Sequence, residues 1–209
     1  VLNNGVFSYD AETNTLILSG NYTAASTWAL IQNMIPDLTI SVSEKTVLNA
    51  RFAGILSTQS LTVTGPGKLT VKSESDCAIY ATNGATLKLE AVNVNASGMW
   101  GIAGSNYGEK LEIEGSTVYA NGSSGAICDF DGGIDLIGCE IFEPAGGKVK
   151  DGAIVDGSGV LPYEAIIKVE GASGLPCSGG EDCPGNVFTD MPAKGNWAHD
   201  AIDWAIVYK

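Results

Sequence analysis

The chain is poor in positive charge, in helix-favouring stretches and in long apolar runs. Lys and Arg number 11 against 24 Asp and Glu, which gives a formal net charge of −13. A nucleic acid or an anionic membrane surface requires clustered cations, so this balance excludes both as expected partners. No apolar run reaches about 18 residues, so the sequence predicts no transmembrane segment. Before Asn196, no long window is rich in Leu, Glu, Lys and Arg, which argues against a helical domain.

Glycine and small polar residues are abundant instead. The chain has 27 Gly among 209 residues, together with many Ser, Thr, Asn and Asp. Gly, Asn and Asp adopt positive φ at low cost, so this composition is typical of short strands joined by tight turns. The strands repeat. Residues 78–98, 101–122 and 126–146 each contain an Ile, a turn with Gly, an alternating apolar pair and a further Val or Ile strand.

Three columns of apolar residues keep this period, with steps of 23 to 26 residues. Scattered apolar residues would not stay in phase through so many turns. Each repeat has room for three short strands and three corners, and stacked turns place equivalent residues above one another. The columns are Ile31, Ile55, Ile79, Ile102 and Ile127; Ile40, Val63, Leu89, Ile113 and Leu136; and Val47, Val71, Val94, Val118 and Ile141.

The period and the alternation together predict an all-β fold. The expected architecture is a right-handed parallel β-helix, a single-stranded solenoid of about five coils, with capping elements and a short C-terminal helix. Leucine-rich repeats have a similar period, but they need a Leu-x-x-Leu-x-Leu-x-x-Asn frame that is missing here. A β-sandwich also has many short strands, but it would not keep three columns in phase.

Both ends of a solenoid need cover, because open strand edges invite aggregation. Residues 5–20 predict a hairpin, and residues 23–34 predict either a short capping helix or an irregular first turn. Apolar runs that leave the register after Gly146 predict the last strands and a cap. We expect a β-helix domain at 1–171, a Gly/Pro/Cys linker at 172–187 and a partial second module at 188–209.

The tail has helical apolar spacing after Asn196, which can act as an N-cap. Its sequence, FTDMPAKGNWAHDAIDWA, resembles the opening of an S-layer homology (SLH) module: Phe-x-Asp-Val-Pro, Trp-Ala, then an Ala-Ile-x-Trp/Tyr-Ala helix. The later motif that grips cell-wall polysaccharide is absent. The resemblance implies a parent protein on a Gram-positive-type bacterial cell surface. The matching residues are Phe188, Asp190, Pro192, Trp197, Ala198, Ala201, Ile202 and Ala205, with Met191 in place of Val.

The body contains FSYDAETNTLILSG, LTISV and GILSTQSLTVTGPGKLTV, followed by Gly-Ile turns. Over residues 5–170 this texture resembles the carbohydrate-binding β-helix modules of secreted clostridial and gut-bacterial proteins, which have a pectate-lyase-like fold. The resemblance lies in the repeats and includes no catalytic signature. It implies polysaccharide binding, often with Ca²⁺. We therefore expect a monomeric, extracellular, cell-surface-associated polysaccharide-binding module without catalytic activity.

Aromatic side chains are the candidate sugar platform, because their faces stack on sugar rings. Trp100, Tyr80, Tyr107 and Tyr119 fall in corners or on outward strand positions of neighbouring turns. Glycines flank Trp100 and would leave its ring uncovered. The alternative is that these rings pack under loops.

A short acidic turn and the cysteines offer further candidates. Asp129, Asp131 and Asp135 have a spacing compatible with Ca²⁺, although Asp-Gly pairs also occur in plain turns. Cys177 and Cys183 flank a small loop and predict a disulfide in an oxidising setting, with free thiols as the alternative. The remaining cysteines lie among Ile, Ala and Gly, and we expect small core residues at Cys77, Cys128 and Cys139.

Catalysis and scaffolding are the alternative functions. A polysaccharide lyase needs calcium-binding carboxylates and a base, but Arg51 has no acidic cluster beside it in sequence, and we expect His199 to be solvated. A glycoside hydrolase needs two carboxyl groups roughly 5–10 Å apart. Stacked turns would bring together a set of outward carboxylates, or leave them as a solvated face. A spacer or adhesin that binds protein is the third class. The carboxylates are Glu90, Glu112, Glu114 and Asp135.

Overall fold

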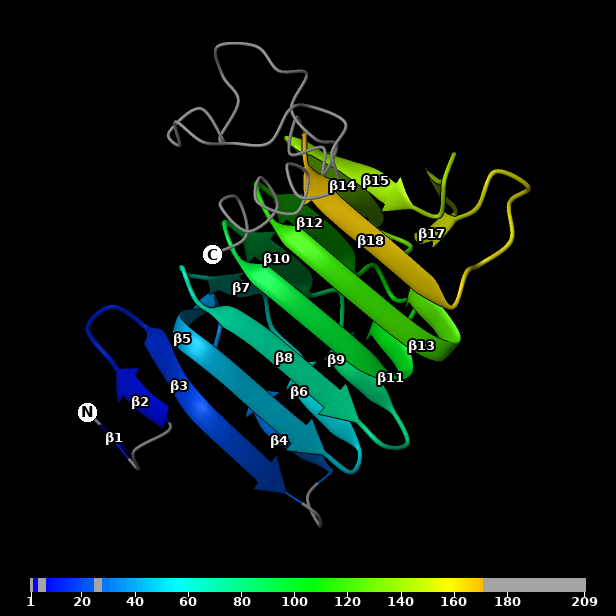
Figure 1. Ribbon diagram of the computed structural model, residues 1–209. Coiled ribbons are helices and arrows are strands. Elements are labelled where there is room, and N and C mark those ends of the chain that lie inside the picture. The colour runs from blue at the N-terminus through cyan, green and yellow to red at the C-terminus, as the bar shows by residue number, and fades with distance from the viewer. Residues whose placement is uncertain (1, 4–6, 25–27, 171–209) are drawn as a thin grey trace, which may run out of the picture. The chain divides into compact units, whose positions relative to one another are not determined.

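The computed structural model describes residues 2–3, 7–24 and 28–170. This part of the chain is all-β, and its parallel strands stack as a right-handed solenoid of about five turns, as predicted (Figure 1). It belongs to one compact unit, Val1–Glu170. The predicted linker, the SLH fragment, the short C-terminal helix and the Cys177–Cys183 pair lie outside the described residues.

Each turn contributes strands to three faces, which we call A, B and C in chain order. Face A contains the first halves of β3 (Thr15–Ala24) and β5 (Leu38–Ala50), then β7 (Leu61–Thr64), β10 (Thr86–Glu90), β12 (Lys110–Glu114) and β14 (Gly133–Ile137). Face B, in front in Figure 1, contains the second halves of β3 and β5, β8 (Lys68–Ser73), and the first halves of β11 (Asn93–Ala103) and β13 (Thr117–Cys128). Face C contains β4 (Ala29–Asn33), β6 (Ala53–Ser57), β9 (Cys77–Ala81) and the second halves of β11 and β13.

Two of the three predicted columns are confirmed as vertical files in the core. On face C, Ile31 pairs with Ile55, Ile55 with Ile79, Ile79 with Ile102, and Ile102 with Ile127. On face A, the column from Ile40 to Leu136 is paired without interruption in the same way. Burying each large aliphatic side chain contributes about 1.5–3 kcal/mol, so the files hold successive coils together.

The third predicted column is wrong in its register. Val47 faces outward on β5 and is half-buried, whereas its neighbour Leu48 is fully buried and pairs with Val71. Val94 pairs with Leu69 and not with Val71. Because side chains alternate between the two faces of a strand, an error of one residue turns a side chain from the core to the solvent. In addition, β18 separates the last two members of the column.

The N-terminal end carries the predicted hairpin. β1 (Leu2–Asn3) pairs with β2 (Phe7–Asp10), and β2 pairs antiparallel with β3 across the turn that ends at Asn14. The capping helix considered for residues 23–34 is not found, because Ala29–Asn33 forms β4 in register with β6. Its alternation of Leu30 and Gln32 with buried Ile31 and Asn33 suits a strand better than a helix.

The C-terminal end departs from parallel stacking, as the loss of phase after Gly146 predicts. β18 (Glu164–Val169) lies antiparallel between β13 and β15 (Cys139–Glu143), which extends face B. β16 (Lys148–Lys150) and β17 (Ala153–Val155) form a separate hairpin. The buried side chains of Ala165 and Ile167 complete the core at this end. The described residues contain no helix able to span a membrane.

Close packing of the coils explains some of the glycines. A Cβ atom on Gly54 would lie against Cγ1 of Val71 and 2.5 Å from the carbonyl oxygen of Ala78. At the corner between faces A and B, Gly65 has a φ of +116° and its Cβ would lie 2.5 Å from the carbonyl oxygen of Val42. Only glycine allows the backbones to approach so closely at these points.

Candidate functional site

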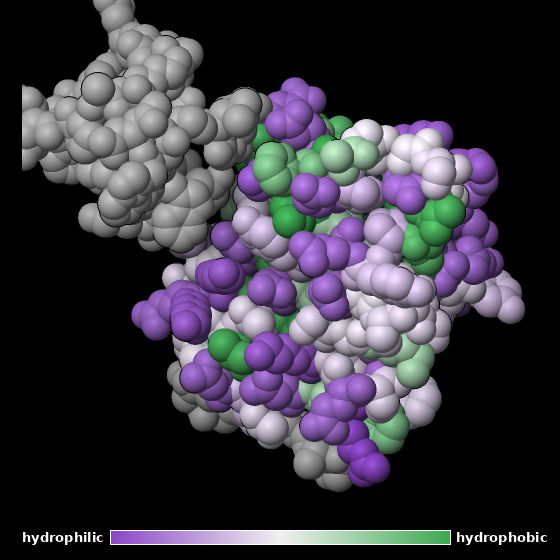
Figure 2. Space-filling model, turned by 45° about the vertical axis from the view of Figure 1, so that its right-hand side comes forward, coloured by the Kyte–Doolittle hydropathy of each residue, from purple (hydrophilic) through white to green (hydrophobic). Residues whose placement is uncertain are grey.

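A groove on face B is the candidate functional site. It has a volume of about 450 Å³. One file of outward residues runs along it, because Thr23 pairs with Asn49, Asn49 with Lys72, and Lys72 with Ser97. Hydrophilic residues dominate the visible surface of the described unit, and hydrophobic residues form separate patches (Figure 2). The lining residues are Thr23, Asn49, Ala50, Lys72, Ser73, Glu74 and Ser97.

The groove offers several kinds of polar group in one row. Asn49 Nδ2 donates a hydrogen bond to Thr23 Oγ1 at 3.2 Å. Ser97 continues the row, and the next residue in the file, Asn121, is exposed. The exposed ammonium group of Lys72 has no ion-pair partner among the residues that the structure describes. The row therefore presents hydroxyl, amide and ammonium groups to a ligand at the spacing of the coils, about 4.8 Å.

A second row of outward residues lies on the same face, four residues before the groove file on each strand. Lys68 pairs with Asn93, and Asn93 pairs with Thr117. Asn93 Oδ1 is buried and has no hydrogen-bond partner in the described part of the chain. A buried amide oxygen without a partner is uncommon, because its desolvation is not compensated.

The predicted sugar platform is not assembled as one surface. Tyr80 and Trp100 come together on the outer side of face C, but they are partly buried in a small cluster with Ala153 and Leu161 from the C-terminal segment. Tyr107 is 79% exposed, in the corner between β11 and β12. Tyr119 lies on face B, paired with Asn95 and half-buried. Tyr80 and Trp100 are thus only partly available to a ligand, and sugar binding by these rings stays a prediction.

The three predicted calcium ligands have separate partners. Asp129 Oδ1 accepts a hydrogen bond from Asn106 Nδ2 at 3.1 Å, and Asp131 Oδ1 accepts one from the backbone N–H of Gly108. Asp135 lies on face A and forms an ion pair with Lys110 at 2.8 Å. No group of three or more His, Cys, Asp or Glu side chains within residues 2–3, 7–24 and 28–170 is arranged to hold a metal ion. Calcium binding stays a prediction.

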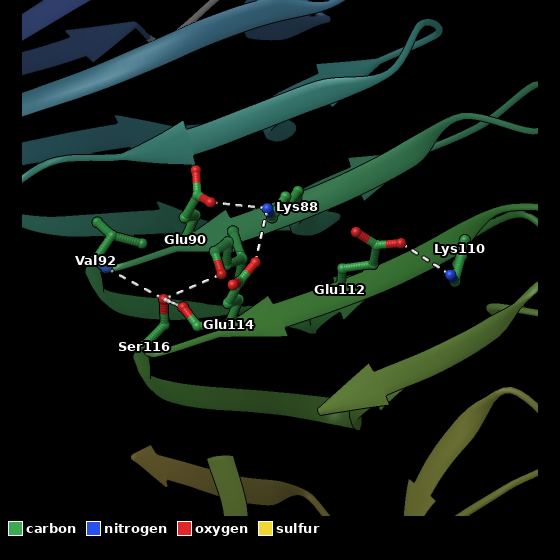
Figure 3. Close-up of polar contacts among 8 residues, drawn as sticks. Lys88, Glu90, Val92, Lys110, Glu112, Glu114 and Ser116 are labelled. Atoms are coloured by element: carbon green, nitrogen blue, oxygen red, sulfur yellow. Dashed lines mark hydrogen bonds and ion pairs between the residues drawn. The ribbon is translucent and has the colours of Figure 1, made fainter. Parts of the chain in front are cut away.

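The outward carboxylates of face A do come together, and lysines join them. Lys88 Nζ lies 2.8 Å from Glu90 Oε1 and 2.7 Å from Glu114 Oε2 (Figure 3). Lys110 Nζ lies 2.8 Å from Glu112 and 2.8 Å from Asp135. The carboxylates raise the pKa of each lysine: Glu114 and then Glu90 act on Lys88, and Asp135 and then Glu112 act on Lys110. Each stacked carboxylate pair is bridged by a cation, which offsets the repulsion between like charges.

Glu109 is a buried carboxylate that sequence reasoning missed. Its side chain is inaccessible to solvent at the corner between faces C and A. It accepts hydrogen bonds from the backbone N–H groups of Gly84 at 2.9 Å, Ser105 at 3.0 Å and Tyr107 at 2.9 Å, and from Ser105 Oγ at 2.9 Å. Burial raises the pKa of Glu109, but these hydrogen bonds outweigh it and the pKa lies below the ordinary value. The hydrogen bonds of this side chain therefore link two successive corners.

The cysteines of the described unit are buried free thiols, as predicted. Cys77 and Cys128 belong to the cluster under Leu161, and Cys139 lies at the corner between faces A and B. Burial, and then the charge of Asp129, raise the pKa of Cys128 to about 12. Burial also raises the pKa of Cys77. Thiols that stay protonated are poor nucleophiles and poor metal ligands, so these cysteines are packing residues.

Comparisons with known proteins give no relative for this chain. No protein-family model matches it, and neither a curated protein nor a solved structure matches it.

Proposed function

We propose that this chain is an extracellular polysaccharide-binding module and that the groove on face B holds the polymer. The observation that carries the proposal is the file from Thr23 to Ser97, which runs along the groove through four stacked strands. Sugars are recognised by hydroxyl, amide and charged groups that pair with their own hydroxyls. A polymer is favoured over a single sugar because the groove repeats its polar groups from coil to coil.

A binding role is favoured over catalysis by the state of the carboxylates. On face A, each stacked pair shares a lysine within 2.8 Å, so neither pair is arranged as a free acid with a free base. In the groove, Glu74 is the single carboxylate among the described lining residues. A hydrolase that follows the usual mechanism needs two. The cell-surface location rests on the SLH resemblance of residues 188–209 and is part of the proposal.

The test is retention of the full chain on an array of plant and bacterial cell-wall glycans, with and without EDTA. We expect binding to one class of polymer. Lys72→Ala should weaken it about tenfold or more, since a hydrogen bond to a charged group contributes about 1.5–3 kcal/mol, and Asn49→Ala by up to about tenfold, since a neutral hydrogen bond contributes about 0.5–1.5 kcal/mol. Lys45→Ala is the matched control, because Lys45 is also exposed and has no ion pair among the described residues, but lies at another corner.

Three results would change the proposal. Absence of retention on every glycan would favour a spacer that binds protein. Shortened glycan chains would favour an enzyme. Equal binding by Lys72→Ala and Lys45→Ala would move the site away from the groove. Separately, loss of binding in EDTA would support the predicted calcium dependence, whereas unchanged binding would argue against that prediction.

A further inference from the structure

An exposed aromatic stack lies at the edge between faces B and C. Trp28 and Phe52 precede Ala29 and Ala53, which pair in register, so the two rings occupy equivalent positions in successive coils. Their centroids are 5.9 Å apart and their planes are inclined by 24°. Arg51 Cζ lies 5.4 Å from the centroid of the Phe52 ring. Trp28 and Arg51 thus both lie next to Phe52, and we call these three side chains the edge stack.

The edge stack adjoins the groove. Ala50 lines the groove, and Arg51 and Phe52 are the next two residues of the chain. In the following coil, the N–H of Glu74, which also lines the groove, donates a hydrogen bond to the carbonyl oxygen of Ala50 at 3.0 Å. Ser75 continues this pairing through its own N–H, which bonds to the carbonyl oxygen of Arg51 at 3.1 Å. The backbone therefore runs from the groove to the stack without a break in register.

The rings of the edge stack are exposed and available to a ligand. The Trp28 side chain is 67% exposed, so a large apolar ring faces water. Stacking on Phe52 fixes its orientation, so a ligand would not have to order it. Arg51 is the sole arginine of the chain. Its guanidinium group has no ion pair with a carboxylate and no side-chain hydrogen bond within the part of the chain that the structure describes.

We propose that the edge stack is a sugar-ring subsite that extends the groove and selects pyranoses with equatorial hydroxyls. This inference rests on the proposed function. Such a ring carries only C–H groups on both of its faces, so either face can lie flat on Trp28, and Arg51 can donate hydrogen bonds to hydroxyls at the edge of the ring. A ring with an axial hydroxyl has only one such face, and in the opposite orientation it would press a polar group against the indole without a partner, so fewer rings of such a polymer can stack. The subsite thus takes gluco-configured polymers in preference to manno- or galacto-configured ones.

Affinity electrophoresis of the full chain in gels that contain hydroxyethyl cellulose or galactomannan tests the subsite. We expect the wild type to be retarded more by the glucan. Trp28→Ala should weaken glucan binding about tenfold and remove this preference, and Trp28→Phe should keep part of both, since aromatic stacking adds about 0.5–1.5 kcal/mol to the area term. Tyr163→Ala is the matched control, because Tyr163 is also 67% exposed but lies before β18 at the other end of the solenoid.

The outcomes separate this inference from the proposed function. If Lys72→Ala loses binding while Trp28→Ala binds glucan as the wild type does, the groove stands and the subsite is wrong. If the wild type binds galactomannan as tightly as the glucan, the selectivity is wrong. If the wild type binds neither these polymers nor any glycan of the array, both proposals fall. A circular dichroism spectrum equal to that of the wild type shows that each variant is folded.

Discussion

Replacement of Glu109 should destabilise the solenoid far more than replacement of an exposed glutamate. The carboxylate accepts hydrogen bonds from three backbone N–H groups and one hydroxyl, which belong to two successive corners. Glu109→Ala removes all of these acceptors at once. Glu44→Ala is the matched control, since Glu44 lies at another corner and its side chain is exposed.

The magnitude follows from the donors that are left behind. An unsatisfied buried donor costs about 1–3 kcal/mol. Gly84 and Tyr107 lie in exposed parts of their corners, so water can reach their N–H groups and the lower figure applies. With about 1 kcal/mol for each of the three N–H groups, Glu109→Ala should lose about 3 kcal/mol of the free energy of unfolding. Glu44→Ala should change it by no more than about 0.5 kcal/mol.

The effect should also depend on pH in a defined direction. The pKa of Glu109 is lower in the folded protein than the unfolded value of about 4.3, so the ionised carboxylate stabilises the fold above that value. This contribution declines as the pH falls through the folded pKa. Glu109→Gln should therefore be less stable than the wild type at pH 7, and the gap should narrow toward pH 3.

Urea unfolding followed by far-ultraviolet circular dichroism measures both effects. The wild type, Glu109→Ala, Glu109→Gln and Glu44→Ala are compared at pH 7 and pH 3. The reasoning would be refuted by a Glu109→Ala variant as stable as Glu44→Ala at pH 7. A gap between the wild type and Glu109→Gln that widens on acidification would refute the assigned direction of the pKa.

Three further predictions concern packing and charge. Leu48→Ala should lower the free energy of unfolding by about 2–5 kcal/mol and Val47→Ala by less than about 1 kcal/mol, because only the Leu48 side chain lies in the core. Equal losses in urea unfolding would mean that Val47 points into the core after all. Native protein at pH 8 should leave Cys77 and Cys128 unlabelled by iodoacetamide, with labelling only in urea, because burial keeps both thiols protonated; peptide mapping by mass spectrometry that finds either one labelled in buffer would contradict this. Lys88→Ala should lower the midpoint of urea unfolding at low salt, because Glu90 and Glu114 would then face each other without a cation between them. The loss should shrink in 1 M salt, where the Debye length is about 3 Å and the repulsion between the two carboxylates is screened. A loss that grows with salt would argue against a bridging role for Lys88.

The inward files could be predicted because one residue type recurs where one environment recurs. Ile31, Ile55, Ile79 and their partners occupy the same place in each coil, and this buried place tolerates few side chains other than large aliphatic ones. The third column failed because Val47 and Leu48 are both apolar, so composition does not say which of them points inward. Which of the two points inward depends on whether the preceding corner is one residue longer or shorter, and corner lengths vary freely at the surface.

The groove could not be found in the same way, although it has the same period. Thr23, Asn49, Lys72 and Ser97 are spaced by 26, 23 and 25 residues, as the core columns are. The four share polarity but no common residue type, so their alignment emerges only once the inward files fix the register. Glu109 was missed because an acidic residue in a Gly-rich corner looks like an ordinary solvated side chain.

The surroundings of Tyr80 and Trp100 could not be predicted for a related reason. Both lie on face C, where they pack against an apolar cluster that Ala153 and Leu161, from a segment beyond the break in phase, also contact. No repeat predicts where that segment returns. The edge stack went unnoticed because Trp28 lies within a stretch expected to be a capping helix or an irregular turn, so its equivalence with Phe52 was hidden.

The outer sides of the three faces differ in what they leave available to a ligand. On face A, Lys88 and Lys110 are each held by two carboxylates, so the polar groups there are already paired with one another. On face C, the C-terminal coils carry an apolar cluster beneath Leu161. Face B combines a groove, a cation without an ion-pair partner in the described residues and a row of amides and hydroxyls. Since a ligand must displace whatever a polar group already binds, its net gain is largest on face B.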